Sequence, residues 1–164
     1  MATAAAPADE TMAMSEGANS VSYVEKYCLR AGSVGDRKTR LEADGWIERF
    51  DPAQGWPSDA ALRVFTMPGS KYVITITSPA TDRNFVRDCI VDGKGVAAKE
   101  VIDAALDKWG RPEQSPDHIY YWPQPKQSER TILIANSMVF QDTDAPAFAL
   151  VVRFGPSQYP TKED

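Results

Sequence analysis

Residues 96–109, VAAKEVIDAALDKW, decide the fold, because they form a strongly helical segment between two groups of strand-like segments. Apolar residues recur at helical spacing along one face of this segment, and charged residues fall on the opposite face. Gly110 and Pro112 follow and end the helix. We therefore predict an amphipathic helix that buries one apolar stripe against a sheet: Ala98, Val101, Ile102, Ala105, Leu106 and Trp109.

Strand-like segments lie on both sides of this helix. In residues 71–78 the side chains alternate between two faces, which is the pattern of a half-buried strand. Pro68-Gly69-Ser70 separates this segment from the one before it and is typical of a hairpin turn. About six strands are predicted, three before the helix and three after it, at 61–67, 71–78, 84–91, 118–122, 130–140 and 147–154.

Two helices are predicted ahead of the first strand. The first covers residues 21–31, where apolar residues recur at helical spacing before Gly32, and the second covers 36–43. The element order is therefore ααβββαβββ. Short turns between consecutive strands imply antiparallel pairing, so we predict a two-layer α+β domain with a mainly antiparallel sheet.

The composition of the two ends places the domain boundaries. Residues 1–19 contain few large apolar side chains, and we predict a disordered N-terminal segment there. Residues 20–154 form the single α+β domain. Residues 155–164 return to turn-forming and charged residues and are predicted to be a C-terminal tail.

The charge balance of the 164 residues excludes several classes of partner. Asp and Glu outnumber Lys and Arg by 23 to 18, which leaves a formal net charge of -5. Nucleic-acid binding needs a basic face, so no nucleic-acid partner is expected.

No apolar run approaches the roughly 20 residues of a membrane-spanning helix, so no membrane insertion is expected. Two cysteines and one histidine exclude a metal site built from several such ligands, and we predict no metal and no cofactor.

The two cysteines, Cys28 and Cys89, are candidates for a disulfide. Cys28 falls on the apolar face of a predicted helix and Cys89 inside a predicted strand. Closing so long a loop would remove about 4 kcal/mol of unfolded-state entropy in the chain-entropy description. The alternative is a pair of buried thiols that pack as small apolar groups.

The disulfide and the first residues bear on the compartment. A disulfide favours a periplasmic or secreted location. The alanine-rich start resembles the region that follows a signal peptide, and we hypothesise that Met1 replaces a removed leader. A disordered cytoplasmic start rich in alanine is the alternative.

The aromatic segment around His118 is the first candidate binding region. His118, Tyr120, Tyr121 and Trp122 lie close together in the sequence, and aromatic side chains can stack on a sugar or on a partner's apolar side chain. A lone histidine can also act as a general base. The alternative is ordinary packing, because aromatic residues are favoured in strands.

Three further residues are weaker candidates. Lys94 lies in a glycine-rich turn before the central helix, where an anion could bind, although such turns mostly only connect elements. Arg87 could bind a carboxylate through its forked guanidinium group. Alternatively, Arg87 and Asp88 could be charges that protect an edge strand from aggregation, with their side chains on opposite faces. Asn136 shares a predicted face with apolar residues and could supply the polar point of an apolar cavity. A β-bulge that turns Asn136 to solvent is the simpler alternative.

Two classes of function remain open from the sequence. The first is a non-enzymatic binding or protein-interaction domain, and the missing catalytic motif favours it. The second is a small enzyme or ligand-binding protein with a pocket between the sheet and the central helix, involving His118. The expected partner is accordingly another protein or a small ligand.

Overall fold

The computed structural model describes residues 15–49, 60–79, 81–114, 120–123, 130–137, 139 and 147–154. These residues form one eight-stranded sheet with the order β1-β2-β3-β4-β8-β7-β6-β5, and every neighbouring pair is antiparallel. The strands are β1 (Ile47–Arg49), β2 (Ala60–Thr66), β3 (Tyr72–Pro79), β4 (Asp88–Lys94), β5 (Glu113–Gln114), β6 (Tyr120–Pro123), β7 (Arg130–Asn136) and β8 (Ala147–Phe154).

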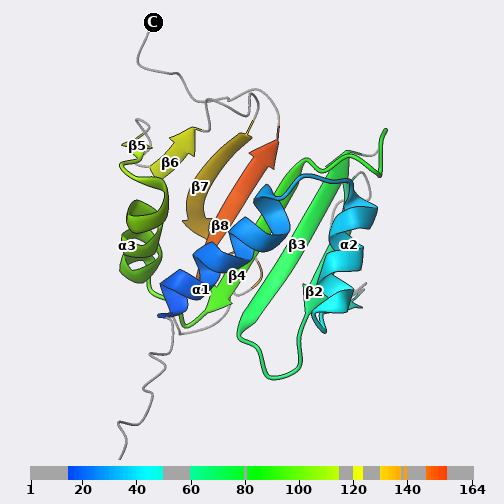
Figure 1. Ribbon diagram of the computed structural model, residues 1–164, viewed down its shortest axis with the longest axis horizontal. Helices are drawn as coiled ribbons and strands as arrows, with labels where there is room; N and C mark the ends of the chain where they lie inside the picture. Colours follow the sequence, from blue (N-terminus) through cyan, green and yellow to red (C-terminus); the bar gives the residue numbers. More distant parts are fainter. Residues whose placement is uncertain are drawn as a thin grey trace, which may run out of the picture.

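The helices form a second layer on one face of this sheet (Figure 1). They are α1 (Glu16–Tyr23), which continues into the π-helix η1 (Val24–Leu29), α2 (Val34–Ala43) and α3 (Ala98–Trp109). The main core lies between the two layers and includes Val24, Phe65, Ile76, Val101 and Leu150. The predicted α+β, two-layer, antiparallel architecture is confirmed.

All six predicted strands are present, and two short ones join the edges of the sheet. β1 has three residues and β5 has two, which is too short for a visible alternation of side chains. The strand predicted at 84–91 starts later, at Asp88, and residues 81–87 form a turn in which Phe85 is half exposed. Gly93 belongs to the glycine-rich segment that was expected to form a turn around Lys94, but it lies inside β4, where a Cβ would collide with Tyr72 and Val96.

The N-terminal helix begins earlier than predicted. Ser15 caps it by accepting a hydrogen bond from the backbone N–H of Ala18 at 3.1 Å, and the helix starts at Glu16. Residues 15–19 therefore belong to the fold, whereas the expected disordered segment extended to residue 19. The rest of that segment, and the expected C-terminal tail, lie outside the described residues.

A very close contact joins α1 to α3. Gly17 is buried, and a Cβ at this position would overlap the carbonyl oxygen of Glu100. The two helix backbones can approach this closely only because Gly17 has no side chain. This contact positions the start of α3 over the sheet.

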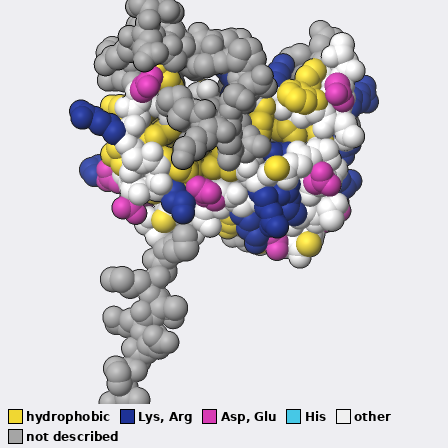
Figure 2. Space-filling view, turned by 45° about the horizontal axis from the view of Figure 1, so that its top comes forward, with side chains coloured by type: hydrophobic (Ala, Val, Ile, Leu, Met, Phe, Trp, Pro, Cys, Tyr) yellow, Lys and Arg dark blue, Asp and Glu magenta, His cyan; other side chains and the backbone are white. Residues whose placement is uncertain are grey.

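Charged side chains are unevenly distributed over the surface. Figure 2 shows Lys and Arg side chains gathered in a dense group on the face that it presents, whereas Asp and Glu are more scattered. A chain with an acidic overall balance therefore carries locally basic surface.

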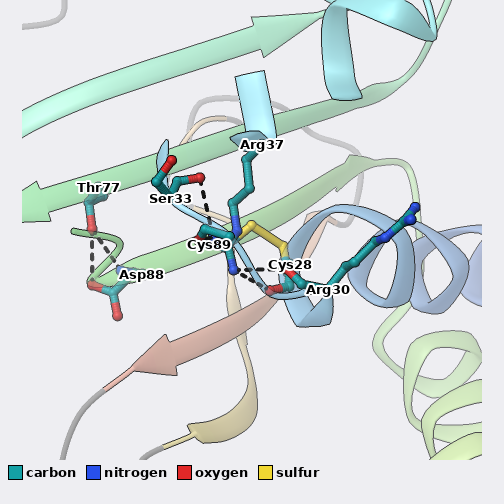
Figure 3. Close-up of a disulfide and its surroundings, with 8 residues drawn as sticks. Cys28, Arg30, Ser33, Arg37, Thr77, Asp88 and Cys89 are labelled. Carbon is teal, nitrogen blue, oxygen red and sulfur yellow. Dashed lines mark hydrogen bonds between the residues drawn. A yellow bond between two sulfur atoms is a disulfide. The ribbon is translucent and has the colours of Figure 1, made fainter. Parts of the chain in front are cut away.

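A disulfide joins the helical layer to the sheet. Cys28 of η1 and Cys89 of β4 are bonded, with 5.5 Å between their Cα atoms, and both are fully buried (Figure 3). The predicted disulfide is therefore confirmed. The buried Arg37 of α2 supports the segment beside it by donating hydrogen bonds to the carbonyl oxygens of Cys28 (3.0 Å) and Arg30 (3.2 Å).

A second polar tie connects η1 to the end of α2. The hydroxyl of Tyr27 donates to a carboxylate oxygen of Asp44 at 2.7 Å and accepts from the indole N–H of Trp46 at 3.2 Å. Lys26 lies 2.8 Å from the same carboxylate oxygen of Asp44. The hydrogen bonds from Lys26 and Tyr27 hold the pKa of Asp44 below its usual range, whereas burial raises the pKa of Tyr27.

Filling the α1–α3 contact is expected to destabilise the protein. Gly17→Ala places a methyl group against the backbone of Glu100, so the two helices must separate, at a cost of about 2 kcal/mol or more in free energy of unfolding. Gly35→Ala is the control, because Gly35 is also helical and a Cβ there would make only an ordinary van der Waals contact, 3.7 Å from the hydroxyl oxygen of Ser33. Urea unfolding should show a loss for Gly17→Ala alone. Equal stabilities would contradict the close contact.

Removing the disulfide is expected to lower stability without changing the fold. The double variant Cys28→Ala, Cys89→Ala frees a loop with a sequence separation of 61. Its free energy of unfolding should fall by about 4 kcal/mol in the chain-entropy description. The measurement is denaturant unfolding, with far-ultraviolet circular dichroism to follow secondary structure. An unchanged unfolding midpoint would argue against the bond.

Asp44 is expected to contribute to stability in a pH-dependent way. A carboxyl whose pKa is lowered by folding stabilises the folded state above its ordinary pKa, about 3.9 for Asp, and loses this contribution as the pH falls through the lowered value. Asp44→Asn should therefore be less stable than the wild type at neutral pH, and the difference should shrink below about pH 4. Thermal unfolding from pH 2 to 8 tests this, with the exposed α3 residue Asp103→Asn as control. A constant difference at every pH would be inconsistent with the stabilising role of the carboxylate.

Candidate ligand pocket

A cavity of about 410 Å³ lies between α3 and the helix-facing side of the sheet. Its walls come from four elements: α3, β6, β7 and β8. The described lining residues are Ala98, Ile102, Tyr120, Leu133, Ile134, Ala135, Asn136 and Phe148. A volume of this size falls within the range of about 300–1,000 Å³ that is usual for small-molecule sites.

The alternation of side chains along three strands builds the sheet side of the cavity. Asn136 of β7 pairs directly with Phe148 of β8, and Ile134 precedes Asn136 by two residues on the same face. Tyr120 is at the start of β6, next to the pair that Tyr121 forms with Leu133. β7 continues for two residues after Ile134, to Asn136, and the cavity lies beside this end of the strand.

Two residues of α3 build the opposite wall. Ala98 is the first residue of the helix and Ile102 follows four positions later, so both lie on the same helix face. Ala98 has a small side chain, and this leaves room between the helix and the sheet. The close α1–α3 contact at Glu100 fixes the position of this part of α3.

The polarity of the lining changes from the interior to the mouth. Ile134 is buried and Ile102 and Phe148 are partly buried, whereas Tyr120 and Asn136 are exposed. Tyr120 and Asn136 are also the described lining residues whose side chains carry hydrogen-bonding groups. The cavity thus combines an apolar interior with a phenol and an amide near its opening.

Asn136 lies in regular strand pairing rather than in a bulge. The β7–β8 register runs without interruption from Arg130 opposite Phe154 to Asn136 opposite Phe148. The β-bulge that we considered simpler is therefore wrong. Asn136 reaches solvent because it is the last residue of the strand, where the cavity opens.

Two of the aromatic candidates are buried and cannot form an exposed partner surface. Trp122 packs on Trp109 with 5.9 Å between ring centroids, and its indole N–H donates to the carbonyl of Gly110 at 2.9 Å. Tyr121 points to the opposite face of the sheet, where its hydroxyl donates to Glu113 at 2.9 Å. Neighbouring side chains of a strand face opposite ways, and here both side chains are buried. His118 lies outside the described residues.

Lys94 and Arg87 do not reach the cavity. Lys94 is the exposed last residue of β4, and its backbone N–H donates to the carbonyl of Lys71 at 3.0 Å. Arg87 precedes β4, and its Nε donates to the neighbouring Asp88 at 3.3 Å. Arg87 lies before the first residue of β4, so the alternation of faces that we expected for Arg87 and Asp88 in one strand does not apply to this pair.

The sequence prediction missed most of the apolar lining. Ile102 and Ile134 have the spacing of ordinary core residues, and nothing in that spacing separates a residue that packs from one that borders a cavity. The small side chain of Ala98 at the start of a helix carries no distinct signal either. Asn136 was the detectable signal, because it interrupts an otherwise apolar strand face.

Two other features are absent from the described residues. These residues contain no cluster of three or more His, Cys, Asp or Glu residues with the geometry of a metal site. Within the same part of the chain, no helix is long and apolar enough to span a membrane.

Comparison of the chain with known protein families, with curated proteins and with solved structures gave no match.

Proposed function

We propose that this protein binds a small organic molecule with an apolar body and one hydrogen-bonding group, in the cavity between α3 and the sheet. The observation that supports this most directly is the polarity of the lining, in which apolar side chains form the interior and Asn136 and Tyr120 lie at the opening. Ligand sites commonly pair apolar walls with a few well-placed polar groups.

In this proposal the amide of Asn136 orients the ligand at the opening and selects ligands that can form hydrogen bonds with it. An amide both donates and accepts hydrogen bonds, and the hydroxyl of Tyr120 does the same. A ligand with a hydroxyl or amide group would satisfy these residues while its apolar part displaces water from the interior. A ligand without such a group would leave them with water only.

Among the two classes of function expected from the sequence, ligand binding has the stronger support. A protein-interaction surface on the aromatic segment required Tyr121 and Trp122 to be accessible, and both are buried. Tyr120 is the described aromatic residue of that segment that is exposed, and it lines the cavity. We include His118, which lies two positions before Tyr120 in the sequence, among the residues of the proposed binding site.

We place this binding function in an oxidising compartment, periplasmic or extracellular. The buried bond between Cys28 and Cys89 supports this, because such bonds form and persist where thiols are not kept reduced.

Blocking the cavity is expected to abolish ligand binding. The neutral apolar dye N-phenyl-1-naphthylamine should bind the wild type saturably, with an increase in fluorescence. Ile102→Trp fills the interior and should weaken binding about tenfold or more, since overlap forces the dye or the helix to move. Leu106→Trp is the matched control, because Leu106 lies one turn further along α3, is exposed and does not line the cavity. Circular dichroism verifies that both variants fold.

A second substitution tests the polar opening. Asn136→Leu should weaken binding of 1-naphthol by about tenfold, the equivalent of one hydrogen bond, while binding of naphthalene changes little. Competition with the dye gives both affinities. Absence of saturable dye binding to the wild type, or equal binding to Ile102→Trp, would refute the proposed function.

A further inference from the structure

A buried carboxylate holds two arginines at the other end of the sheet from the cavity. Asp88, at the start of β4, is 6% exposed. The Nε of Arg153 donates to its Oδ1 at 3.0 Å, and the Nε of Arg87 donates to its Oδ2 at 3.3 Å. One negative charge therefore faces two positive charges, and the group carries a net positive charge.

The carboxylate of Asp88 is fixed from the sheet side. Thr77 of β3 is its cross-strand neighbour, and the two residues exchange hydrogen bonds: the Thr77 hydroxyl donates to Oδ2 at 3.4 Å, and the Asp88 N–H donates to Thr77 Oγ1 at 3.1 Å (Figure 3). Asp88 also pairs directly with Arg153 of β8. The carboxylate of Asp88 is therefore held in place by contacts to the strands on both sides of β4.

The backbone of Arg87 is fixed as well. Its N–H donates to the carbonyl of Thr77 and its carbonyl accepts from the N–H of Phe154, both at 2.8 Å. Arg87 and Arg153 therefore start from rigid positions, and their Nε atoms are bonded to one carboxylate. This arrangement limits the freedom of both guanidinium groups before any ligand arrives.

The outer parts of both guanidinium groups remain available. The ion pairs with Asp88 use Nε in each case, and the described contacts of Arg87 and Arg153 leave the Nη atoms unused. Half of the Arg87 side chain and about a third of the Arg153 side chain are exposed, at 50% and 36%. Exposed guanidinium donors beside a fixed carboxylate suit an oxyanion, because guanidinium geometry matches carboxylate and phosphate oxygens.

We propose that Arg87 and Arg153, positioned by Asp88, bind an oxyanion, a phosphate or a carboxylate group. This site is separate from the cavity. Arg153 lies five residues beyond Phe148 on β8 and on the opposite face of the sheet, about 17 Å along the strand. Two guanidinium groups around one carboxylate leave this site with a local positive charge, although the chain as a whole has a net charge of -5.

Side-chain NMR of the full chain tests this proposal. Nitrogen-15 spectra of the arginine Nε groups are recorded while inorganic phosphate, acetate or chloride is added at constant ionic strength. The Nε signals of Arg87 and Arg153 should shift saturably with phosphate, with acetate or with both, and the stronger of the two anions identifies the source. Chloride should cause no saturable shift. Equal shifts with chloride, or no shift with either oxyanion, would overturn the site.

Substitutions distinguish binding through the planar donors of a guanidinium group from attraction by positive charge alone. Arg153→Lys keeps the positive charge but loses the planar donors, and it should weaken oxyanion binding about tenfold. Arg63→Gln is the control, since Arg63 is similarly exposed, at 39%, and is ion-paired to Glu48 on β1. Thermal unfolding identifies any variant that does not fold, and Arg87→Lys then replaces Arg153→Lys. Unchanged binding in the lysine variant, or an equal loss in Arg63→Gln, would argue against a built site.

Discussion

The bond between Cys28 and Cys89 is the constraint on which the arrangement of the two layers depends. It ties the π-helix η1 to β4, a central strand of the sheet, and it is surrounded by the main core. Arg37 then fixes the chain that leaves η1, and Tyr27 with Asp44 fixes the end of α2. At the other end of the same helical segment, Gly17 brings α1 into backbone contact with α3. The position of α3, and so the width of the cavity, follows from this chain of contacts.

The two proposed sites use the sheet in different ways. The cavity lies on the helix-facing side, next to the end of β7 at Asn136. The arginine pair lies on the opposite face, where three strands supply Thr77, Asp88 and Arg153 at one level. One sheet therefore offers an apolar site and a charged site that do not share a residue, and a single ligand of small size cannot occupy both.

Much of the fold could be predicted from the sequence, because helix and strand periodicities were clear over long segments. The helix at 96–109 and the strands at 71–78 and 147–154 match the observed elements to within two residues. The disulfide was also accessible, since both cysteines fell on predicted apolar faces. Failures arose where tertiary contacts override local signals. Gly93 looks like a break and is a packing requirement, and Ser15 caps a helix in a segment that is poor in large apolar side chains.

The candidate site was less predictable for a physical reason. A cavity depends on how far apart two layers lie, and this distance is set by residues such as Gly17 that do not line it. Asn136 and Tyr120 could be singled out because a polar or aromatic residue in a strand invites an explanation. The pairing of Arg87 with Asp88 and Arg153 could not, because it needs the cross-strand register between β4 and β8.

The strand order has a consequence for how the chain reaches its native state. β8 lies between β4 and β7, so it joins the half-sheet β1–β4 to the half-sheet β5–β7. During synthesis β4 therefore has an unsatisfied edge until β8, the last described strand, has left the ribosome. The central pairing has a large sequence separation, which slows folding. The sheet of such a chain therefore stays incomplete until β8 has been synthesised.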